Sequence, residues 1–253
     1  MKILVPCKIV PDDQDIVVTS DGTLDFSKAH QIISTYDLNA LEAAAQLAAT
    51  IGDAHVVALS VGPSTIDDAK VKKNILARGI DELYMIADDQ LSEADAYLTA
   101  SALFELVQRV GDFDLIICGD GSADMYAQQV DIQLASLLGV PGVNGVISIK
   151  TPQGSVVEVE RLLEDSIETI ETELPAVVSV VPDIALPRLC GMKDILAAGK
   201  KPQESVELTS AEQQVIEVIE CRAPQMAARK QQIVDGSDGN ALAEMAATIK
   251  TLI

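Results

Sequence analysis

Short apolar runs alternate with longer amphipathic segments through the first half of the chain. The apolar runs have the length and composition of strands buried on both faces of a parallel sheet, and they lie at residues 2–7, 54–61, 82–87 and 114–118. The segments that follow carry apolar residues at helical spacing, and they lie at 38–50, 66–78, 93–110 and 125–138. Alternating strands and helices with short connections indicate right-handed crossovers. The pattern predicts an α/β fold, a mostly parallel sheet with helices on both faces.

The rhythm changes after Pro141. Four further strand-like runs follow with little between them, at 143–150, 155–162, 166–173 and 176–181. We expect this meander to extend the sheet as an antiparallel edge or to form a small second layer. Earlier in the chain, Ser20-Asp21-Gly22 lies between two short apolar runs and predicts a β-hairpin over residues 16–26.

From residue 203 the sequence is extended and acidic, and it ends in an amphipathic helix predicted at 240–252. This tail has an apolar helix but too few apolar residues for a core, so it is either a disordered appendage or an arm ordered by a partner. The helix favours the arm. We therefore expect an α/β nucleotide-binding domain at 1–202 and a docking arm at 203–253, with a short helix at 192–196 near the junction.

The turn Gly119-Asp-Gly-Ser-Ala-Asp124 joins a predicted buried strand to a predicted helix. Such turns lie at the carboxyl edge of a parallel sheet, where α/β folds bind ligands and a helix start offers N–H groups to an anion. The segment matches neither the GxxxxGK[ST] loop nor the GxGxxG fingerprint. An ordinary turn capped by Ser122 or Asp124 explains it equally well, just as Lys8 past the first strand is either a pocket residue or a solvated lysine.

Charge and composition narrow the function. Asp and Glu number 39 against 18 Lys and Arg, a formal net charge of -21, which argues against nucleic acid and against anionic membranes and favours a partner protein with a basic patch. Four widely spaced cysteines without a CxxC pair indicate buried thiols, and two histidines exclude a histidine-rich metal site. Because no Ser/His/Asp set or credible pair of catalytic carboxylates is present, we predict no catalytic residues and no metal site.

The N-terminal run Met1–Val5 is halted by Pro6, too early for a signal peptide, and no stretch has the length needed to span a bilayer. We expect a cytoplasmic protein that is not an integral membrane protein.

One segment carries a family resemblance. Val159-Glu-Arg161 precedes an acidic turn at Glu164-Asp165, then Glu168, then the apolar run that begins at Leu174-Pro175. This order is similar to the signature of the β subunit of electron transfer flavoproteins, although Ser166 stands where the family has Gly or an acidic residue. The segments 3–8, 33–42 and 60–62 also resemble family segments, and the chain is most similar to the Fix-type branch.

The resemblance implies a heterodimer whose α subunit holds the redox-active FAD, while this subunit buries AMP. Such a carrier would take electrons from a flavin dehydrogenase of the acyl-CoA or a related type and pass them on, with a quinone oxidoreductase as a candidate acceptor. In electron-bifurcating relatives a second FAD replaces AMP, and the sequence leaves both ligands open. A stand-alone adenine-nucleotide-binding protein of the adenine-nucleotide α-hydrolase-like fold is the other hypothesis. It should have a Gly/Ser-rich loop where this chain has Pro6–Pro11.

The resemblance also implies which residues contact the nucleotide. Together with Lys8, they are Pro6, Ser34, Thr35, Tyr36, Asp37, Val61, Gly119, Asp120, Gly121, Ser122, Ala123, Asp124, Gln128, Gln129 and Val130. Ser34-Thr35 replaces a common Asn-Pro, and Asp131 replaces a glycine. The Asp131 carboxylate would repel a phosphate unless it turns outward on the helix. Tyr36 corresponds to an aromatic residue near the flavin of the α subunit, or is a half-buried tyrosine that opens a helix; Asp37 can cap that helix.

The segment 188–196 resembles the loop with which the family recognises a partner dehydrogenase. The predicted partner-binding residues are Arg188, Leu189, Met192 and Ile195, with Met192 as the apolar anchor. Without the family, the same residues are simply the start of a short helix.

Overall fold

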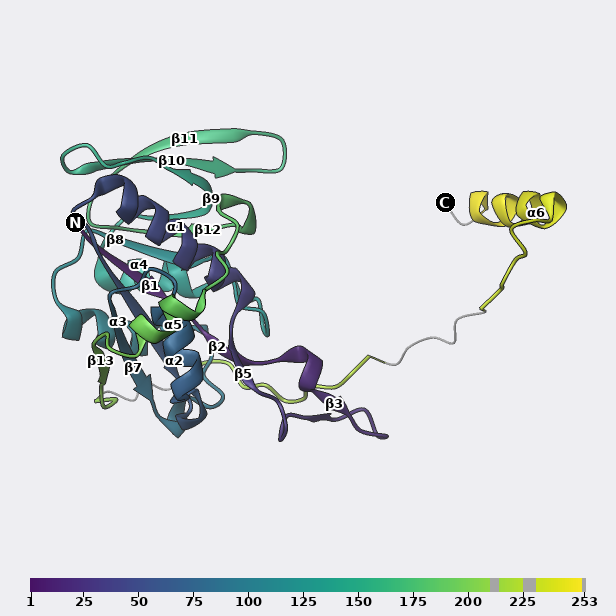
Figure 1. Cartoon of the computed structure of the whole chain (residues 1–253), viewed down its shortest axis with the longest axis horizontal. Coiled ribbons are helices and arrows are strands. Elements are labelled where there is room, and N and C mark those ends of the chain that lie inside the picture. Colours follow the sequence, from purple (N-terminus) through teal and green to yellow (C-terminus); the bar gives the residue numbers. More distant parts are fainter. Residues whose placement is uncertain (210–213, 225–230, 252–253) are drawn as a thin grey trace.

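A nine-stranded sheet forms the centre of the computed structural model, which describes residues 1–209, 214–224 and 231–251 (Figure 1). The strand order is β11-β10-β9-β12-β8-β1-β6-β7-β13. The strands are β1 Lys2–Pro6, β6 His55–Gly62, β7 Glu82–Ala87, β8 Leu115–Gly119, β9 Gly142–Ile149, β10 Val156–Leu162, β11 Ile167–Glu173, β12 Ala176–Val180 and β13 Gln203–Ser205. All neighbours from β9 to β13 in this order are parallel, and the two antiparallel pairs are β9–β10 and β10–β11.

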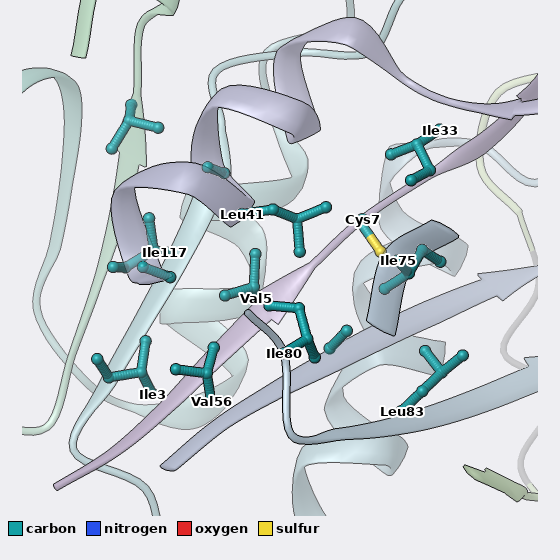
Figure 2. Packing of buried hydrophobic residues seen from close by; sticks show 14 of the residues in the cluster. Ile3, Val5, Cys7, Ile33, Leu41, Val56, Ile75, Ile80, Leu83 and Ile117 are labelled. Atoms are coloured by element: carbon teal, nitrogen blue, oxygen red, sulfur yellow. The ribbon is translucent and has the colours of Figure 1, made fainter. Parts of the chain in front are cut away.

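Helices cover both faces of the sheet, which confirms the predicted fold class. The helices are α1 Thr35–Ile51, α2 Ala69–Leu76, α3 Ala96–Val110, α4 Val130–Leu138, α5 Met192–Ala198 and α6 Gly239–Lys250, of which α6 does not cover the sheet. The β1 side chains alternate between the two faces: Ile3 and Val5 pack with α1 and α2, whereas Leu4 packs with α3 and α4. Figure 2 shows the first of these cores, where Leu41 of α1 meets Val5.

Two short ribbons lie outside the main sheet. The predicted hairpin is present as β3 Val17–Val18 paired with β4 Leu24–Asp25, and Gly22 in its turn has a φ of 87°. Next to it, β2 Ile9–Pro11 pairs with β5 Gln31–Ile33. This second ribbon leads the chain directly into α1, so the start of α1 lies beside the end of β1.

Four helix starts differ from the prediction by three or more residues. The second and third helices begin three residues later than predicted, at Ala69 and Ala96. The first helix begins at Thr35, with Ser34 as its N-cap, so Asp37 lies inside the first turn and is not the cap. The fourth helix begins at Val130 rather than at residue 125, because Tyr126 and Gln128 have φ values of 45° and 56°, which a right-handed helix does not allow. The connection from β8 to α4 is therefore a ten-residue turn, 120–129.

The meander was only partly predicted. Its strands are present, and β10 and β11 form the expected antiparallel edge. The strand β12, however, lies between β9 and β8 and is parallel to both. Its residues are all buried, since helices cover both faces at this central position.

The predicted arm begins on the sheet itself. The short strand β13 pairs with β7 at the sheet edge, and Val206 and Leu208 just after it pack against the core next to α3. Further on, α6 lies well apart from the sheet and buries none of its side chains (Figure 1). In the ranges that the structure describes, no helix has both the length and the apolar character needed to cross a membrane.

Candidate functional site: a pocket at the carboxyl ends of the strands

A pocket of about 220 Å³ lies past the carboxyl ends of β1, β6 and β8. This is the edge at which parallel α/β sheets bind their ligands. Its wall includes many of the residues predicted to bind a nucleotide, namely Pro6, Lys8, Asp37, Val61, Gly119, Asp120, Gly121, Ser122, Gln128, Gln129 and Val130. We call it the strand-end pocket. The fold thus brings together residues that are up to 124 positions apart in the sequence.

The other predicted nucleotide residues lie beside the pocket and not on its wall. The Ser34 hydroxyl oxygen accepts a hydrogen bond from the Ala123 N–H at 3.2 Å. Asp124 forms an ion pair with the Lys8 ammonium at 2.6 Å. Burial would raise the pKa of Asp124, but the charge and hydrogen bond of Lys8 outweigh it, so this pKa lies below its usual value. Thr35 is the first residue of α1.

Asp37 ties the floor of the pocket together. Its carboxylate is buried and accepts the Lys8 N–H at 2.7 Å, with a further hydrogen bond from the Gly119 N–H. A Cβ atom on Gly119 would lie 2.6 Å from Asp37 Oδ1, so only glycine fits at the end of β8. Burial raises the pKa of Asp37 to about 7, against the hydrogen bonds that lower it.

Within the turn 120–129, the side chain of Tyr126 packs directly against the backbone of Gly121. The Tyr126 ring lies where a Cβ on Gly121 would be, at 2.3 Å from that position. Its hydroxyl donates to Asp120 Oδ2 at 2.7 Å, which raises the pKa of Tyr126 to about 12. The ring also packs against Tyr36, with a centroid separation of 4.8 Å. Tyr36 thereby contacts this turn from the first turn of α1.

The pocket wall is acidic. Carboxylates line it from four parts of the chain, as Asp37, Glu93, Asp95, Asp120 and Asp131, and Lys8 is the one basic residue among its described lining residues. Such a wall suits the hydroxyl and amino groups of a nucleoside, which donate hydrogen bonds. A phosphate would need Lys8 and the N–H groups at the start of α4.

Asp131 does not turn outward, the arrangement that would have removed its repulsion of a phosphate. It is buried, and its carboxylate accepts a hydrogen bond from the Ser179 hydroxyl of β12. This contact points the carboxylate at the sheet instead of at solvent, and Asp131 still borders the pocket. The hydrogen bond occupies one of its oxygens, which reduces the repulsion that it would exert on a neighbouring phosphate.

Arg161, the basic residue of the family-like signature, lies in a second pocket of about 290 Å³. This pocket shares Asp120, Gln128 and Asp131 with the strand-end pocket. The Arg161 guanidinium donates to Asn144 Oδ1 at 2.7 Å. The signature arginine therefore lies next to the nucleotide candidates, on the far side of Asp131.

Part of the wall was missed. The start of α3 contributes Glu93, Ala94, Asp95, Ala96, Thr99 and Leu103, and the C-terminal arm contributes Ile216 and Val218. Cys7, Cys118, Met125 and Ala127 also line the pocket, together with Asp131, which the resemblance had already placed near a phosphate. An aspartate directly before an amphipathic run is an N-cap signal, so Asp95 could have been found. The two arm residues had no local signal, because their position depends on contacts with α3.

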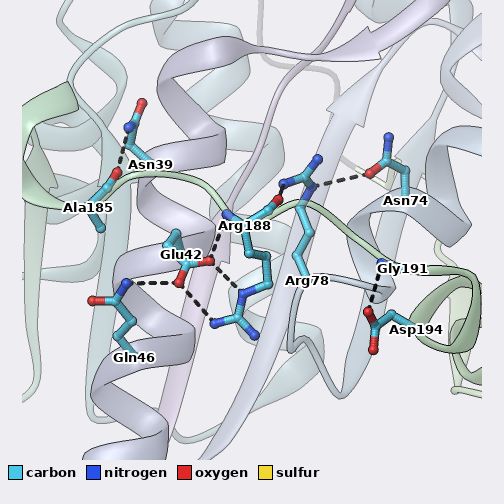
Figure 3. Close-up of polar contacts among 9 residues, drawn as sticks. All are labelled: Asn39, Glu42, Gln46, Asn74, Arg78, Ala185, Arg188, Gly191 and Asp194. Atoms are coloured by element: carbon cyan, nitrogen blue, oxygen red, sulfur yellow. Dashed lines mark hydrogen bonds and ion pairs between the residues drawn. The ribbon is translucent and has the colours of Figure 1, made fainter.

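The predicted partner-binding loop is held from behind by polar contacts (Figure 3). Asn39 donates to the Pro182 and Ala185 carbonyls at 3.0 and 2.8 Å, and Arg78 donates to the Arg188 carbonyl at 3.0 Å. Arg188 itself turns inward and pairs with Glu42, Nε to Oε2 at 2.6 Å. The backbone of the 182–191 segment is therefore fixed to α1 and, through Arg78, to the residues just after α2.

The apolar side chains of this loop point away from the body. Leu189 is 97% and Met192 75% exposed, and Leu186, Ile195 and Leu196 are exposed beside them. A cluster of exposed apolar side chains marks a protein interaction surface. Of the four predicted partner-binding residues, Arg188 thus holds the loop, while the other three are available to a partner.

No group of three His, Cys, Asp or Glu side chains within the described ranges is arranged to hold a metal ion.

Comparison of the sequence with models of known protein families identifies the family of this chain. The model of the electron transfer flavoprotein domain matches residues 21–211, most of the chain. The chain therefore belongs to the electron transfer flavoprotein family, whose proteins carry electrons together with a partner. The match covers the turn 120–129 and the 182–196 loop.

Proposed function

We propose that this chain is the β-type subunit of a heterodimeric electron transfer flavoprotein, similar to the Fix-type branch, and that it binds AMP in the strand-end pocket. One observation carries the proposal. The residues that the family resemblance assigns to the nucleotide converge from β1, α1, β6 and β8 on one pocket at the carboxyl edge of the sheet.

The residues around this pocket fit an adenine nucleotide. The phosphate would be held by Lys8 and by the N–H groups at the start of α4, where Asp131 is engaged by Ser179. The ribose and base would donate to the carboxylates of the wall. AMP bound here has no redox chemistry, so its role would be structural, joining the turn 120–129 to the ends of the strands.

The redox chemistry of the assembly would come from FAD held mainly by an α subunit. Two exposed apolar surfaces support two partners. The face of α6 that carries Leu242, Met245 and Ile249 is exposed and suits the α subunit, while Leu189 and Met192 suit a flavin dehydrogenase of the acyl-CoA type. The electrons would then pass to an acceptor such as a quinone oxidoreductase, with no step at a side chain of this subunit.

The experiment is to coexpress the chain with its α partner and to identify the nucleotides released on denaturation. We expect a yellow heterodimer that contains one FAD and one AMP. Two FAD molecules per heterodimer, without AMP, would show that the strand-end pocket binds a second FAD, as in bifurcating relatives. A colourless monomer, or a heterodimer whose only nucleotide is one FAD, would contradict the proposed nucleotide site.

A further inference from the structure

The segment of the arm at residues 214–219 crosses the side of the strand-end pocket. Within it, Ile216 and Val218 line the pocket, whereas Val215, Glu217 and Ile219 do not. In an extended chain successive side chains point to opposite sides, so this alternation is the expected one. The arm therefore presents one apolar face, made of two β-branched side chains, to the pocket.

Asp95 fixes this segment to the body. Its Oδ1 caps α3 by accepting the Leu98 N–H at 2.8 Å, and its Oδ2 accepts the N–H groups of Val215 and Ile216 at 2.7 and 2.9 Å. Burial would raise the pKa of Asp95, but these backbone hydrogen bonds outweigh it, so the carboxylate stays ionised at neutral pH. One carboxylate thus joins the start of α3 to the arm at the edge of the pocket.

The segment is also held on either side. Before it, the Thr209 N–H and hydroxyl both donate to Glu105 of α3 at 3.0 Å. After it, the Ala223 N–H donates to the Gly22 carbonyl at 2.9 Å, and the Arg222 guanidinium donates to the Asp21 carbonyl at 3.1 Å. These contacts lie on α3 and on the β3–β4 hairpin, so the arm spans the pocket between two fixed points.

The apolar face of the arm still lacks a complete covering. Ile216 is 56% and Val218 51% exposed, although both border the pocket. The same pocket is also lined by the apolar side chains of Val61 and Leu103. Apolar side chains around an open space accommodate a flat, weakly polar group, and the base is the flat part of an adenine nucleotide.

We propose that Ile216 and Val218 are nucleotide-binding residues that contact the base, and that Asp95 is the positioning residue that holds them in place. This inference rests on the proposed function, because it assigns the arm to the same nucleotide site. It makes the pocket a composite of the α/β body and the arm.

The first test measures AMP and FAD binding to the nucleotide-free full-length chain by calorimetry. In the Ile216→Ser/Val218→Ser double variant we expect binding at least 10-fold weaker than in the unmodified chain. The matched control is Val215→Ser/Ile219→Ser, which removes the same kind of side chains from the other side of the segment and should change binding less than twofold. All four side chains are more than half exposed, so none of these variants should unfold the body.

Binding that is within twofold of the unmodified chain in the Ile216/Val218 variant would overturn the inference and leave the proposed function intact. An unmodified chain that binds neither nucleotide would instead overturn the proposed function, and the inference with it. The two failures are therefore distinguishable.

The second test uses Asp95→Asn and amide hydrogen exchange. Asparagine is as good an N-cap as aspartate, but it has a single acceptor oxygen, so it can cap α3 or hold the arm and not both. We expect the Val215 and Ile216 amides to exchange at least 10-fold faster, with the Leu98 amide still protected and nucleotide binding weakened. Asp68→Asn, at the cap of α2, is the control and should change neither quantity. Unchanged exchange at both arm amides in Asp95→Asn would contradict the positioning role.

Discussion

The turn 120–129 and the 182–196 loop are both irregular segments at the surface, yet they distribute their polar groups in opposite ways. The turn directs hydrogen bonds inward, from Tyr126 to Asp120 and from Ala123 to Ser34, and so closes one side of a pocket. The loop is held by its backbone and by Arg188, so that Leu189 and Met192 remain exposed. In the turn the side chains are immobilised, whereas in the loop the backbone is immobilised and the apolar side chains stay free to contact a partner.

The largest expected effect on stability comes from Gly119, where β8 enters the turn 120–129. In Gly119→Ala the new Cβ would lie 2.6 Å from Asp37 Oδ1 and 3.0 Å from the Tyr36 carbonyl carbon, neither of which can move cheaply. We expect a loss of about 2–3 kcal/mol in the free energy of unfolding, the usual cost of an overpacked core, together with loss of nucleotide binding. Urea denaturation measures the first quantity. Gly236→Ala, which meets nothing within 4 Å, is the control; equal stability of the two variants would show that the turn adapts.

The next effect concerns the loop. Arg188→Ala leaves the Glu42 carboxylate, whose side chain is 7% exposed, without its charged partner. Loss of one partner from a buried pair costs roughly 3–5 kcal/mol. Because the Arg188 side chain is 39% exposed, we expect roughly 1–3 kcal/mol here, measured by urea denaturation at pH 7.

Acid should reduce this difference. Burial would raise the pKa of Glu42, but the hydrogen bonds from Arg188 and Gln46 lower it below its usual value. The stabilisation is therefore present above the unfolded-state pKa and is lost as the pH falls through the folded-state value. The control is Arg109→Ala, which removes an exposed pair with Glu204 and should cost less than about 1 kcal/mol. A cost no larger than that of the control would show that the loop is held without the ion pair.

Asp37 gives a third effect, and here the stability should change with pH in the opposite direction to the Glu42 contribution. Its folded-state pKa of about 7 lies above the ordinary value of 3.8, so between these values the folded chain binds a proton that the unfolded chain has released. Stability should therefore fall as the pH rises from about 4 to about 7, by at most about 1.4 kcal/mol per pH unit from this group.

The variant Asp37→Asn isolates this contribution. It should be less stable than the unmodified chain at pH 5, because it loses one acceptor for the Lys8 and Gly119 N–H groups, but its stability should depend less on pH. Urea denaturation of the nucleotide-free chain at several pH values measures the difference in slope. Identical slopes would show that Asp37 is ionised in the folded chain throughout this range.

The sequence predicted the parallel part of the fold well, because uninterrupted apolar runs such as Ile3–Val5 and Leu115–Ile117 have one stable location, inside a doubly covered sheet. The prediction failed where contacts between residues far apart in the sequence determine the local structure or the strand order. Tyr126 could have continued a helix, but its hydroxyl bonds to Asp120 and its φ is positive. Likewise, nothing near Ala176–Val180 indicates that this strand lies between β8 and β9.

The candidate site was also predictable only where its residues follow from the strand pattern. The residues on strand ends follow from the fold, because the carboxyl ends of parallel strands meet at one edge. The direction of the Asp131 side chain stayed open, since a helix position alone does not reveal a partner such as Ser179 on a neighbouring strand. Ile216 and Val218 reach the pocket because the Val215 and Ile216 N–H groups donate to Asp95, about 120 residues earlier in the chain, and no local pattern encodes this contact.

The smallest effect on stability is expected from Met192→Ala. This variant tests most directly whether the exposed side chains of the 182–196 loop contact a partner. Met192 is 75% exposed, so its truncation removes little buried surface and should change the free energy of unfolding by less than about 0.5 kcal/mol. If the loop is immobilised in order to present this side chain, reduction of the assembled heterodimer by its partner dehydrogenase should slow several-fold at an unchanged flavin content. Leu137→Ala, which truncates an exposed apolar residue on α4 outside the loop, should leave the rate unchanged. Loss of flavin in Met192→Ala would instead place this residue in the contact with the α subunit, and the loop and the turn would then serve the same assembly.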